Sequence, residues 1–282
     1  MSPGKTMNGV FHRSYQGPLK AVILDWAGTT VDYGSCAPVV AYREAFKRKG
    51  LAITTTEARQ AMGTHKKAHL RSILQISSVA KRWKDVHGRV PTEEDVEAMY
   101  QEFVPLLLRC LTNYAELIPG TLIAVNHFRR RGLKIGSTTG YTSEMIKVLL
   151  EEAAKQGYTP DSTVCASDVP AGRPHPWMCL QNAMNLEAYP MEALVKVGDT
   201  GTDLAEGLNA GMWTIGVAQT GNEIGLPEKE FARLDPETRQ TRLNLAYHRM
   251  FEAGAHYVVD SIAGVPSVID EINERLSRGE RP

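Results

Sequence analysis

Carboxylates follow two short apolar segments of the chain, where they could bind a metal ion. Asp25 follows AVIL at residues 21–24, and Asp199 ends ALVKVGD at 193–199, with Asp203 four residues later. Two carboxylates at strand ends can share one hard cation such as Mg²⁺, which prefers oxygen ligands. Asp203 could join them or could simply cap the next helix. The pattern therefore predicts a magnesium site that contains Asp25 and Asp199.

A hydroxyl group and an arginine occupy comparable positions. Thr139 follows the segment LKIGST at 133–138, and Arg173 lies in AGRPHP, after STVCAS at 162–167. Arginine suits phosphoryl oxygens because its charge is permanent and its planar fork can bond two oxygens. Each residue alone could equally belong to a turn or a helix start. Together with the carboxylates they indicate phosphoryl transfer, with Asp25 as the group that attacks phosphorus.

The elements around these residues alternate in a regular way. Short apolar segments rich in β-branched or small residues are typical of buried parallel strands, and helical patterns lie between them. The expected strands are 21–24, 133–138, 162–167, 193–199 and 213–218, and the helices between them are 121–131, 142–156, 177–185 and 203–210. This alternation predicts an α/β fold with a doubly wound, Rossmann-like parallel sheet, whose ligands bind beyond the carboxyl ends of the strands.

Residues 35–112 interrupt that alternation with helical patterns alone. The expected helices are 37–49, 56–62, 68–83 and 92–110. An all-helical insertion after the first strand predicts a cap domain at 35–112 over the core domain, which would comprise 19–34 and 113–282. Residues 1–18 are expected to form a flexible extension. Beyond the sheet, the chain predicts helices at 236–253 and 265–275, with a short apolar run at 256–260.

The order of these motifs resembles a known superfamily. DxxGTT at Asp25, a threonine at a strand end, a basic residue and then GDxxxD at Asp199 are similar to the haloacid dehalogenase-like phosphotransferases. The resemblance implies a Mg²⁺-dependent enzyme with an aspartate nucleophile and the fold described above.

Ala27 is the departure from that pattern. Most phosphatases of the superfamily carry a second aspartate there, which protonates the departing alkoxide and later activates water. Ala27 can do neither, although its backbone carbonyl could reach a metal ion. Either the chain is non-catalytic, or its leaving group needs no protonated oxygen. A carbon leaving group fits the second alternative, provided that an iminium between a lysine and a β-aldehyde serves as the electron sink.

The helical insertion offers such a lysine in AMGTHKKAHL. On one helix, Met62, Lys66 and His69 would share a face, and Lys67 would point about 100° away. An imine-forming lysine must be neutral, and desolvation or nearby cations lower a lysine pKa. His69 could carry protons near neutrality. A Lys-Lys pair is also typical of solvated surface, so it is Ala27 that favours Schiff-base chemistry.

From Leu19 onward, the whole set of motifs resembles the phosphonoacetaldehyde hydrolase family. The matching stretches are DWAGTTVDYG, MGxxKxxH, KIGSTTGYT, DVPAGRPxPWM and VKVGDT. The resemblance implies hydrolysis of the phosphorus–carbon bond of phosphonoacetaldehyde to acetaldehyde and phosphate. It also implies a role for each matching residue: Asp25 as nucleophile, Lys66 as the imine-forming lysine beside His69 and Met62, Thr139 and Arg173 at the phosphoryl group, Mg²⁺ on Asp25, the Ala27 carbonyl and Asp199, and Asp203 in support of the metal. Gly63 would allow a close approach between cap and core.

One position departs from the family. Some members have cysteine directly after DYG, where this chain has Ser35 and then Cys36. Either residue could lie near the site, and Cys36 is expected to be buried as a small apolar residue. His65 and Lys67 receive no assignment, and His175 is interpreted as a loop residue.

Composition restricts the class of protein further. Lys and Arg number 32 and balance 32 Asp and Glu, so no overall positive charge favours nucleic acid as a partner. The four cysteines form no CxxC pair, and no apolar run reaches the roughly 18 to 20 residues that span a bilayer. These features predict a cytoplasmic protein that acts on a small molecule. The family resemblance implies a homodimer through the cap, and Tyr42, Phe46, Leu70 and Ile73 could pack within one cap or across that dimer.

Three other functions stay open at this point. A phosphomonoesterase or sugar-phosphate mutase of the same superfamily would need the acid that Ala27 replaces. A dehalogenase would need neither Mg²⁺ nor Asp199. A phosphate-binding scaffold on the same fold would release no product.

Overall fold

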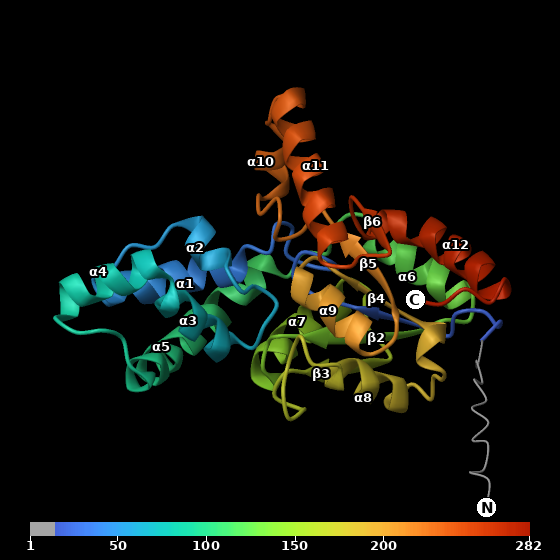
Figure 1. Ribbon diagram of the computed structural model, residues 1–282, viewed down its shortest axis with the longest axis horizontal. Coiled ribbons are helices and arrows are strands. Elements are labelled where there is room, and N and C mark those ends of the chain that lie inside the picture. Colours follow the sequence, from blue (N-terminus) through green and yellow to red (C-terminus); the bar gives the residue numbers. More distant parts are fainter. Residues whose placement is uncertain (1–14) are drawn as a thin grey trace, which may run out of the picture.

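The computed structural model describes residues 15–282, which contain a six-stranded parallel sheet (Figure 1). The spatial order is β3-β2-β1-β4-β5-β6. The strands are β1 (Ala21–Leu24), β2 (Lys134–Thr139), β3 (Ser162–Cys165), β4 (Leu194–Gly198), β5 (Trp213–Val217) and β6 (Tyr257–Val259). The doubly wound α/β fold is confirmed. The short apolar run at 256–260 adds a sixth strand, because it pairs with β5.

The strand register brings the predicted site segments to one edge. Leu24, the last residue of β1, is aligned with Ser137 of β2 and Val197 of β4. The Asp25 N–H continues this pairing by donating to the Val197 carbonyl at 3.0 Å. Asp25, Thr139 and the residues after β4 therefore leave the sheet at its carboxyl edge, as parallel pairing requires.

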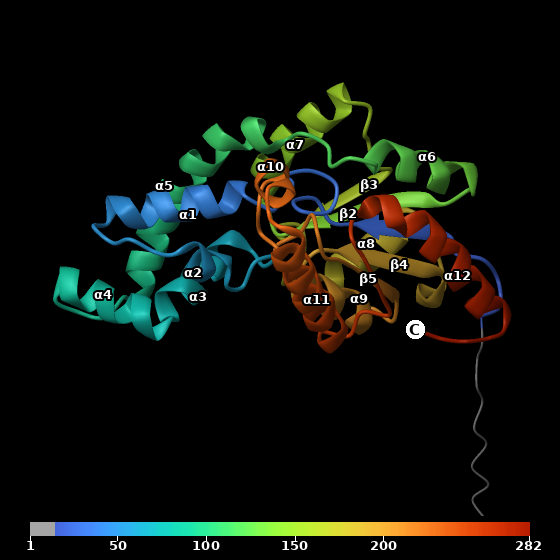
Figure 2. The same ribbon diagram turned by 90° about the horizontal axis from the view of Figure 1, so that it is seen from above.

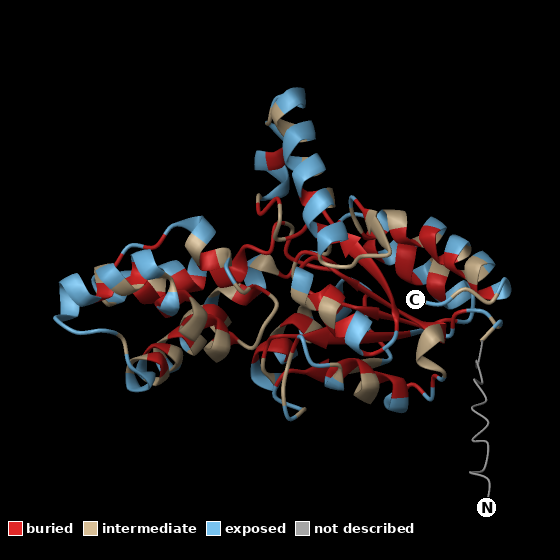
Figure 3. Ribbon diagram, in the orientation of Figure 1, coloured by how far each residue is buried: buried red, intermediate tan, exposed pale blue. Residues whose placement is uncertain are grey.

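Helices cover both faces of the sheet and bury its strands β1, β4 and β5 completely (Figure 3). Two helices, α8 (Trp177–Asn185) and α9 (Gly201–Asn209), pack on one face, and α6 (Thr121–Arg130) and α12 (Val265–Ser277) lie together on the other (Figure 1). The remaining core helices are α7 (Ser143–Lys155), α10 (Glu228–Ala232) and α11 (Pro236–Glu252). No helix within residues 15–282 combines the length and the apolar character needed to cross a membrane.

Five helices between β1 and α6 form a group at one end of the molecule, here called the cap (Figure 2). They are α1 (Ala37–Arg48), α2 (Thr55–Arg59), α3 (Lys66–Gln75), α4 (Ser77–His87) and α5 (Glu93–Leu111). The Tyr42 ring of α1 stacks on Phe103 of α5, with 4.3 Å between ring centroids. Tyr42, Phe46, Leu70 and Ile73 are fully buried in the single chain, so they pack within one cap. The domain boundaries at 35 and 112 stay a prediction.

The segment before Lys66 differs from the sequence prediction. The expected helix over 56–62 ends earlier, because α2 ends at Arg59, and Met62 lies in a turn. Ala61 and Gly63 in that turn have φ of +64° and +86°, which an α-helix does not allow. The imidazole of His65 caps α3 by accepting the Lys67 N–H at 3.2 Å, so the helix begins at Lys66. The prediction that Met62 and Lys66 share a helix is therefore wrong.

The helix expected over 68–83 is also divided in two. It corresponds to α3 and α4, which are separated at Ile76, a residue with extended backbone. The predicted extension at 1–18 falls mostly on residues 1–14, which lie outside the described part of the chain.

Candidate active site

A small cavity lies between the carboxyl edge of the sheet and the cap. Its free volume is about 20 Å³. The residues that line it include most of those predicted for the site: Asp25, Ala27, Met62, Gly63, Lys66, Thr139, Arg173 and Asp199. The structure thus brings together groups from five distant parts of the sequence. A larger groove of about 780 Å³ runs along α8, but none of these residues lines it.

Asp25 and Arg173 are in direct contact inside this buried region. The Arg173 Nη2 donates to Asp25 Oδ1 at 2.7 Å, and their side chains are only 1 % and 7 % exposed. Burial raises the pKa of Asp25, and the nearby Asp203 raises it further, against the opposing effect of Arg173. A positive charge close to Asp25 favours the ionised form of this carboxylate.

Three buried carboxylates could hold a metal ion. Oxygen atoms of Asp25, Asp199 and Asp203 lie within 4.8 Å of one another. Asp199 Oδ2 accepts the Asn222 backbone N–H at 2.8 Å. Burial and then repulsion from Asp25 raise the pKa of Asp199 well above its usual range. A divalent cation would remove this repulsion, so the donor set fits Mg²⁺.

Asp203 is held differently from the other two acids. Its Oδ1 lies 2.8 Å from Lys196 Nζ and 3.0 Å from Arg173 Nη2, and its Oδ2 accepts the Thr200 hydroxyl at 2.5 Å. Burial alone would raise the pKa of Asp203, but Arg173 and Lys196 lower it below its ordinary value. Asp203 therefore stays ionised without a metal ion and anchors the two buried cations.

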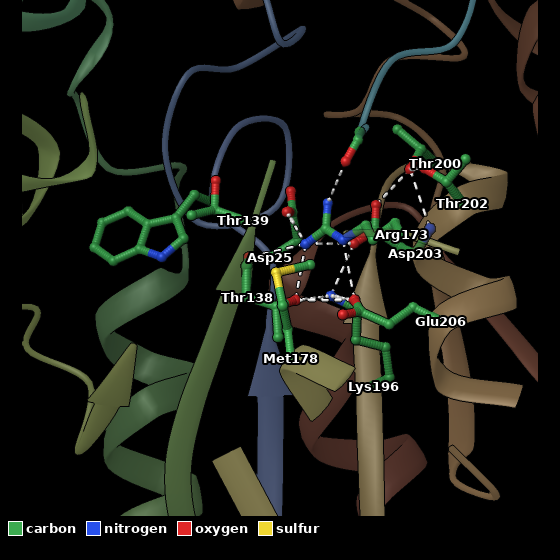
Figure 4. A network of polar contacts seen from close by, with 12 residues as sticks. Asp25, Thr138, Thr139, Arg173, Met178, Lys196, Thr200, Thr202, Asp203 and Glu206 are labelled. Atoms are coloured by element: carbon green, nitrogen blue, oxygen red, sulfur yellow. Dashed lines mark hydrogen bonds and ion pairs between the residues drawn. The ribbon is translucent and has the colours of Figure 1, made fainter. Parts of the chain in front are cut away.

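Lys196 and Glu206 belong to the same network but were missed in the sequence analysis (Figure 4). Glu206 Oε2 accepts from Arg173 Nε at 3.0 Å and from Thr138 Oγ1 at 3.1 Å, and it lies 3.3 Å from Lys196 Nζ. Two signals could have found them. Lys196 is a charge inside a buried strand, and Glu206 lies one helical turn after Asp203.

The network fixes the guanidinium of Arg173. Its Nε and Nη2 donate to the buried acids and to Thr138, whereas Nη1 donates, within the described part of the chain, only to the Gly63 carbonyl of the cap, at 3.3 Å. One Nη1 hydrogen is thus left for a further acceptor. Thr139 lies nearby in the cavity wall, and its Oγ1 accepts the Tyr141 N–H at 3.1 Å, so its hydroxyl hydrogen can also bond a phosphoryl oxygen.

Lys66 approaches the cavity from the first turn of α3. It is 4 % exposed, and its Nζ lies 4.5 Å from the centroid of the Tyr141 ring. Burial is the main cause that lowers the pKa of Lys66 from 10.5 to about 8, with Asp25 opposing the change and Arg173 adding to it. A substantial fraction of the amine is therefore neutral at physiological pH, as imine formation requires. Tyr141 is a further cavity residue that the sequence analysis did not name.

His69 lies behind Lys66 and does not line the cavity. It is completely buried, its Nε2 lies 3.0 Å from the Ala58 carbonyl, and its ring packs 4.4 Å from that of Tyr42. Burial, followed by the charge of Lys66, lowers the pKa of His69 to about 3. The imidazole is therefore neutral at pH 7. The expectation that His69 carries protons near neutrality is not met.

Cap and core meet closely at Gly63. A Cβ at this position would lie 2.4 Å from Thr202 Oγ1 and 2.5 Å from Thr200 Oγ1, so only glycine allows the approach. The Thr202 hydroxyl also donates to the Met62 carbonyl at 3.1 Å. The turn that interrupts the predicted helix is thus one of the segments by which the cap contacts the core.

The residues whose roles the sequence did not settle lie in different parts of the molecule. Ser35 lines the cavity, whereas Cys36 does not, and burial raises the pKa of the Cys36 thiol to about 11. His65 caps α3, and Lys67 pairs with Glu97 across the cap surface. His175 is an exposed residue two positions after Arg173.

Comparison with known proteins agrees with this geometry. A family model described as haloacid dehalogenase-like hydrolase matches residues 19–211. The chain is 52 % identical to a phosphonoacetaldehyde hydrolase of Syntrophobacter fumaroxidans, over 97 % of this chain and 99 % of that protein. It is 49 % identical to one from Bacillus cytotoxicus, over 91 % and 97 % of the two chains.

A solved structure agrees over the full length. The crystal structure of a phosphonoacetaldehyde hydrolase-like protein from Oleispira antarctica superposes with a TM-score of 0.94 at 43 % identity, and covers 99 % of this chain and 100 % of that one. The chain is therefore a haloacid dehalogenase-like hydrolase and belongs to the phosphonoacetaldehyde hydrolase family.

Proposed function

We propose that the protein hydrolyses the phosphorus–carbon bond of phosphonoacetaldehyde to acetaldehyde and phosphate. One observation carries the proposal: Lys66, with its lowered pKa, lines the same buried cavity as Asp25 and Ala27. The cavity combines a nucleophile for phosphorus with an amine for an aldehyde, and Ala27 provides no acid for an alkoxide leaving group. The names of the relatives agree with this activity.

The neutral amine of Lys66 condenses with the aldehyde, and water is released as the imine forms. The imine is protonated to an iminium, which can accept an electron pair. Arg173 and Thr139 hold the phosphonate oxygens, and Asp25 attacks phosphorus in line. The phosphorus–carbon bond breaks, and its electron pair moves through carbon to the iminium nitrogen to give an enamine.

Two hydrolyses complete the turnover. Protonation of the enamine carbon and addition of water to the resulting iminium release acetaldehyde and return Lys66 as an amine. Water then cleaves the phosphorylated Asp25 to free phosphate. Enclosure of the reacting groups between cap and core would exclude bulk water while the carbon–phosphorus bond is broken, which would preserve the imine and strengthen the interactions of the charged groups.

Asp25, the Ala27 carbonyl and Asp199 would hold Mg²⁺, and Asp203 would support the site. Mg²⁺ supplies positive charge that neutralises the phosphoryl oxygens and the nucleophile as they approach. The buried acids Asp25, Asp199, Asp203 and Glu206 outnumber the cations Arg173 and Lys196 of their network by two, which equals the charge of one such ion.

A direct assay tests the proposal. Purified protein with phosphonoacetaldehyde and Mg²⁺ should release acetaldehyde and phosphate in equal amounts, and chelation of the metal should stop both. Borohydride added with the substrate should attach a two-carbon unit to Lys66, detectable by mass spectrometry. A Lys66→Arg variant that keeps full turnover would exclude the imine, and an Asp25→Asn variant with the normal rate would exclude this nucleophile.

The same assay addresses the alternatives. A phosphomonoesterase or mutase would turn over phosphate esters in preference to the phosphonate, although Ala27 provides no acid for their leaving groups. A phosphate-binding scaffold would bind phosphate without forming acetaldehyde. We also propose a cytoplasmic homodimer joined through the cap, on the family resemblance. Sedimentation of the purified protein would test the dimer.

A further inference from the structure

Arg59, the last residue of α2, joins the cap to two other segments. Its Nη1 donates to the Ser35 carbonyl in the β1-to-α1 linker and to Asn222 Oδ1 in the loop after β5, both at 3.1 Å. Its Nη2 donates to the Gly225 carbonyl of the same loop at 2.8 Å and lies 3.8 Å from Cys36 Sγ. One guanidinium thus connects the cap, the linker and the core with all four terminal hydrogens.

The loop after β5 is shaped to receive this side chain. Gly225 has φ of +63°, in the left-handed region, and a Cβ there would lie 2.5 Å from Arg59 Nε. Arg59 Nε is itself buried without a hydrogen-bond partner among residues 15–282. Such a buried donor is costly, so the contacts of the fork must outweigh that cost for the arrangement to persist.

The same loop also holds a residue of the site. The backbone N–H of Asn222 donates to Asp199 Oδ2 at 2.8 Å, while its side chain accepts from Arg59. Thr220 Oγ1, two residues earlier, donates to the Gly28 carbonyl at 2.8 Å, in the segment that follows Asp25. The loop after β5 thus connects Arg59 of the cap to Asp199 at the carboxyl edge of the sheet.

We propose that Arg59 is a positioning residue, which holds the cap closed and, through Asn222, keeps Asp199 oriented. This inference rests on the proposed function, since closure places Lys66 over the core. In a protein that opens and closes, apparent affinity falls with the fraction of the competent state. A charged hydrogen-bond donor typically shifts such an equilibrium by about 10-fold to 100-fold.

Arg59→Ala should lower kcat/KM for phosphonoacetaldehyde by about 10-fold to 100-fold. A second measurement reports whether the cap is closed and does not depend on catalysis. Mg²⁺ and inorganic phosphate should shield Lys66 of the wild-type protein from an amine-acetylating reagent, as measured by mass spectrometry. In Arg59→Ala that shielding should largely disappear.

Three single variants and one double variant separate closure from general stability. Asn222→Ala keeps the backbone bond to Asp199 and loses only the contact with Arg59, so it should lose the shielding of Lys66. The double variant Arg59→Ala/Asn222→Ala should lose little more shielding than Arg59→Ala alone. Arg59→Lys should keep only part of the shielding and of kcat/KM, because an ammonium group cannot bond two acceptors as the planar guanidinium does. Arg82→Ala is the matched control, since Arg82 pairs with Glu57 of α2 and not with the core.

Equal shielding and equal kcat/KM in Arg59→Ala and Arg82→Ala would overturn the inference. So would full additivity of the Arg59 and Asn222 substitutions. If the wild-type protein released no acetaldehyde, the proposed function would fail instead, and the shielding experiment would still report on Arg59.

Discussion

Lys66 shows how burial changes the chemistry of one residue. Its amine is enclosed by the cap and the carboxyl edge of the sheet, and burial lowers its pKa to about 8. Below that pH the neutral fraction, and with it the rate of imine formation, should fall about tenfold per pH unit. Borohydride trapping of the substrate on Lys66, followed between pH 6 and 10, should therefore rise with pH and level off near 8. A profile that keeps rising toward 10.5, the ordinary lysine value, would contradict the lowered pKa.

At the scale of elements, the turn between α2 and α3 determines how closely the cap approaches the core. Gly63→Ala should reduce kcat/KM by at least tenfold, because the new Cβ would displace Thr200 and Thr202 and move Lys66 with the cap. Gly88→Ala is the matched control: Gly88 has a similar φ of +72°, but a Cβ there would meet no described residue within 4 Å beyond its own chain neighbours. The left-handed backbone should cost each variant roughly 1 to 2 kcal/mol of stability, and Gly63→Ala should lose more because it also displaces the two threonines. Equal activity in the two variants would show that the close approach is not required.

At the scale of the whole molecule, the buried acids make folding depend on the metal. Mg²⁺ should raise the unfolding temperature by roughly 5 °C or more at about 100 times its dissociation constant, because it binds the folded carboxylates only. Asp199→Asn should abolish most of this shift, since it removes one ligand and one source of repulsion. Calorimetry with NaCl of equal ionic strength is the control. An unchanged Mg²⁺ shift in the variant would place the ion elsewhere.

The local sequence pattern was sufficient to predict much of the fold and to name many candidate residues. The apolar segments at 21–24 and 213–218 became β1 and β5 almost unchanged, because burial on both faces of a parallel sheet demands continuous apolar runs. Asp25, Thr139 and Asp199 could be grouped because parallel strands end at one edge. Their catalytic roles stay predictions, which the experiments above address.

The sequence by itself determined five of the six strands, the helical insertion and the residue types available for chemistry, since each depends on neighbours along the chain. Only the tertiary structure decided which of those residues meet. In it, a turn replaces the expected helix before Lys66, and His69 is buried away from the cavity. The tertiary structure also paired Lys196 and Glu206 with Arg173 and brought Arg59 to Asn222. These outcomes depend on contacts between segments up to 163 residues apart, and on the loss of water around charged groups, neither of which local pattern records.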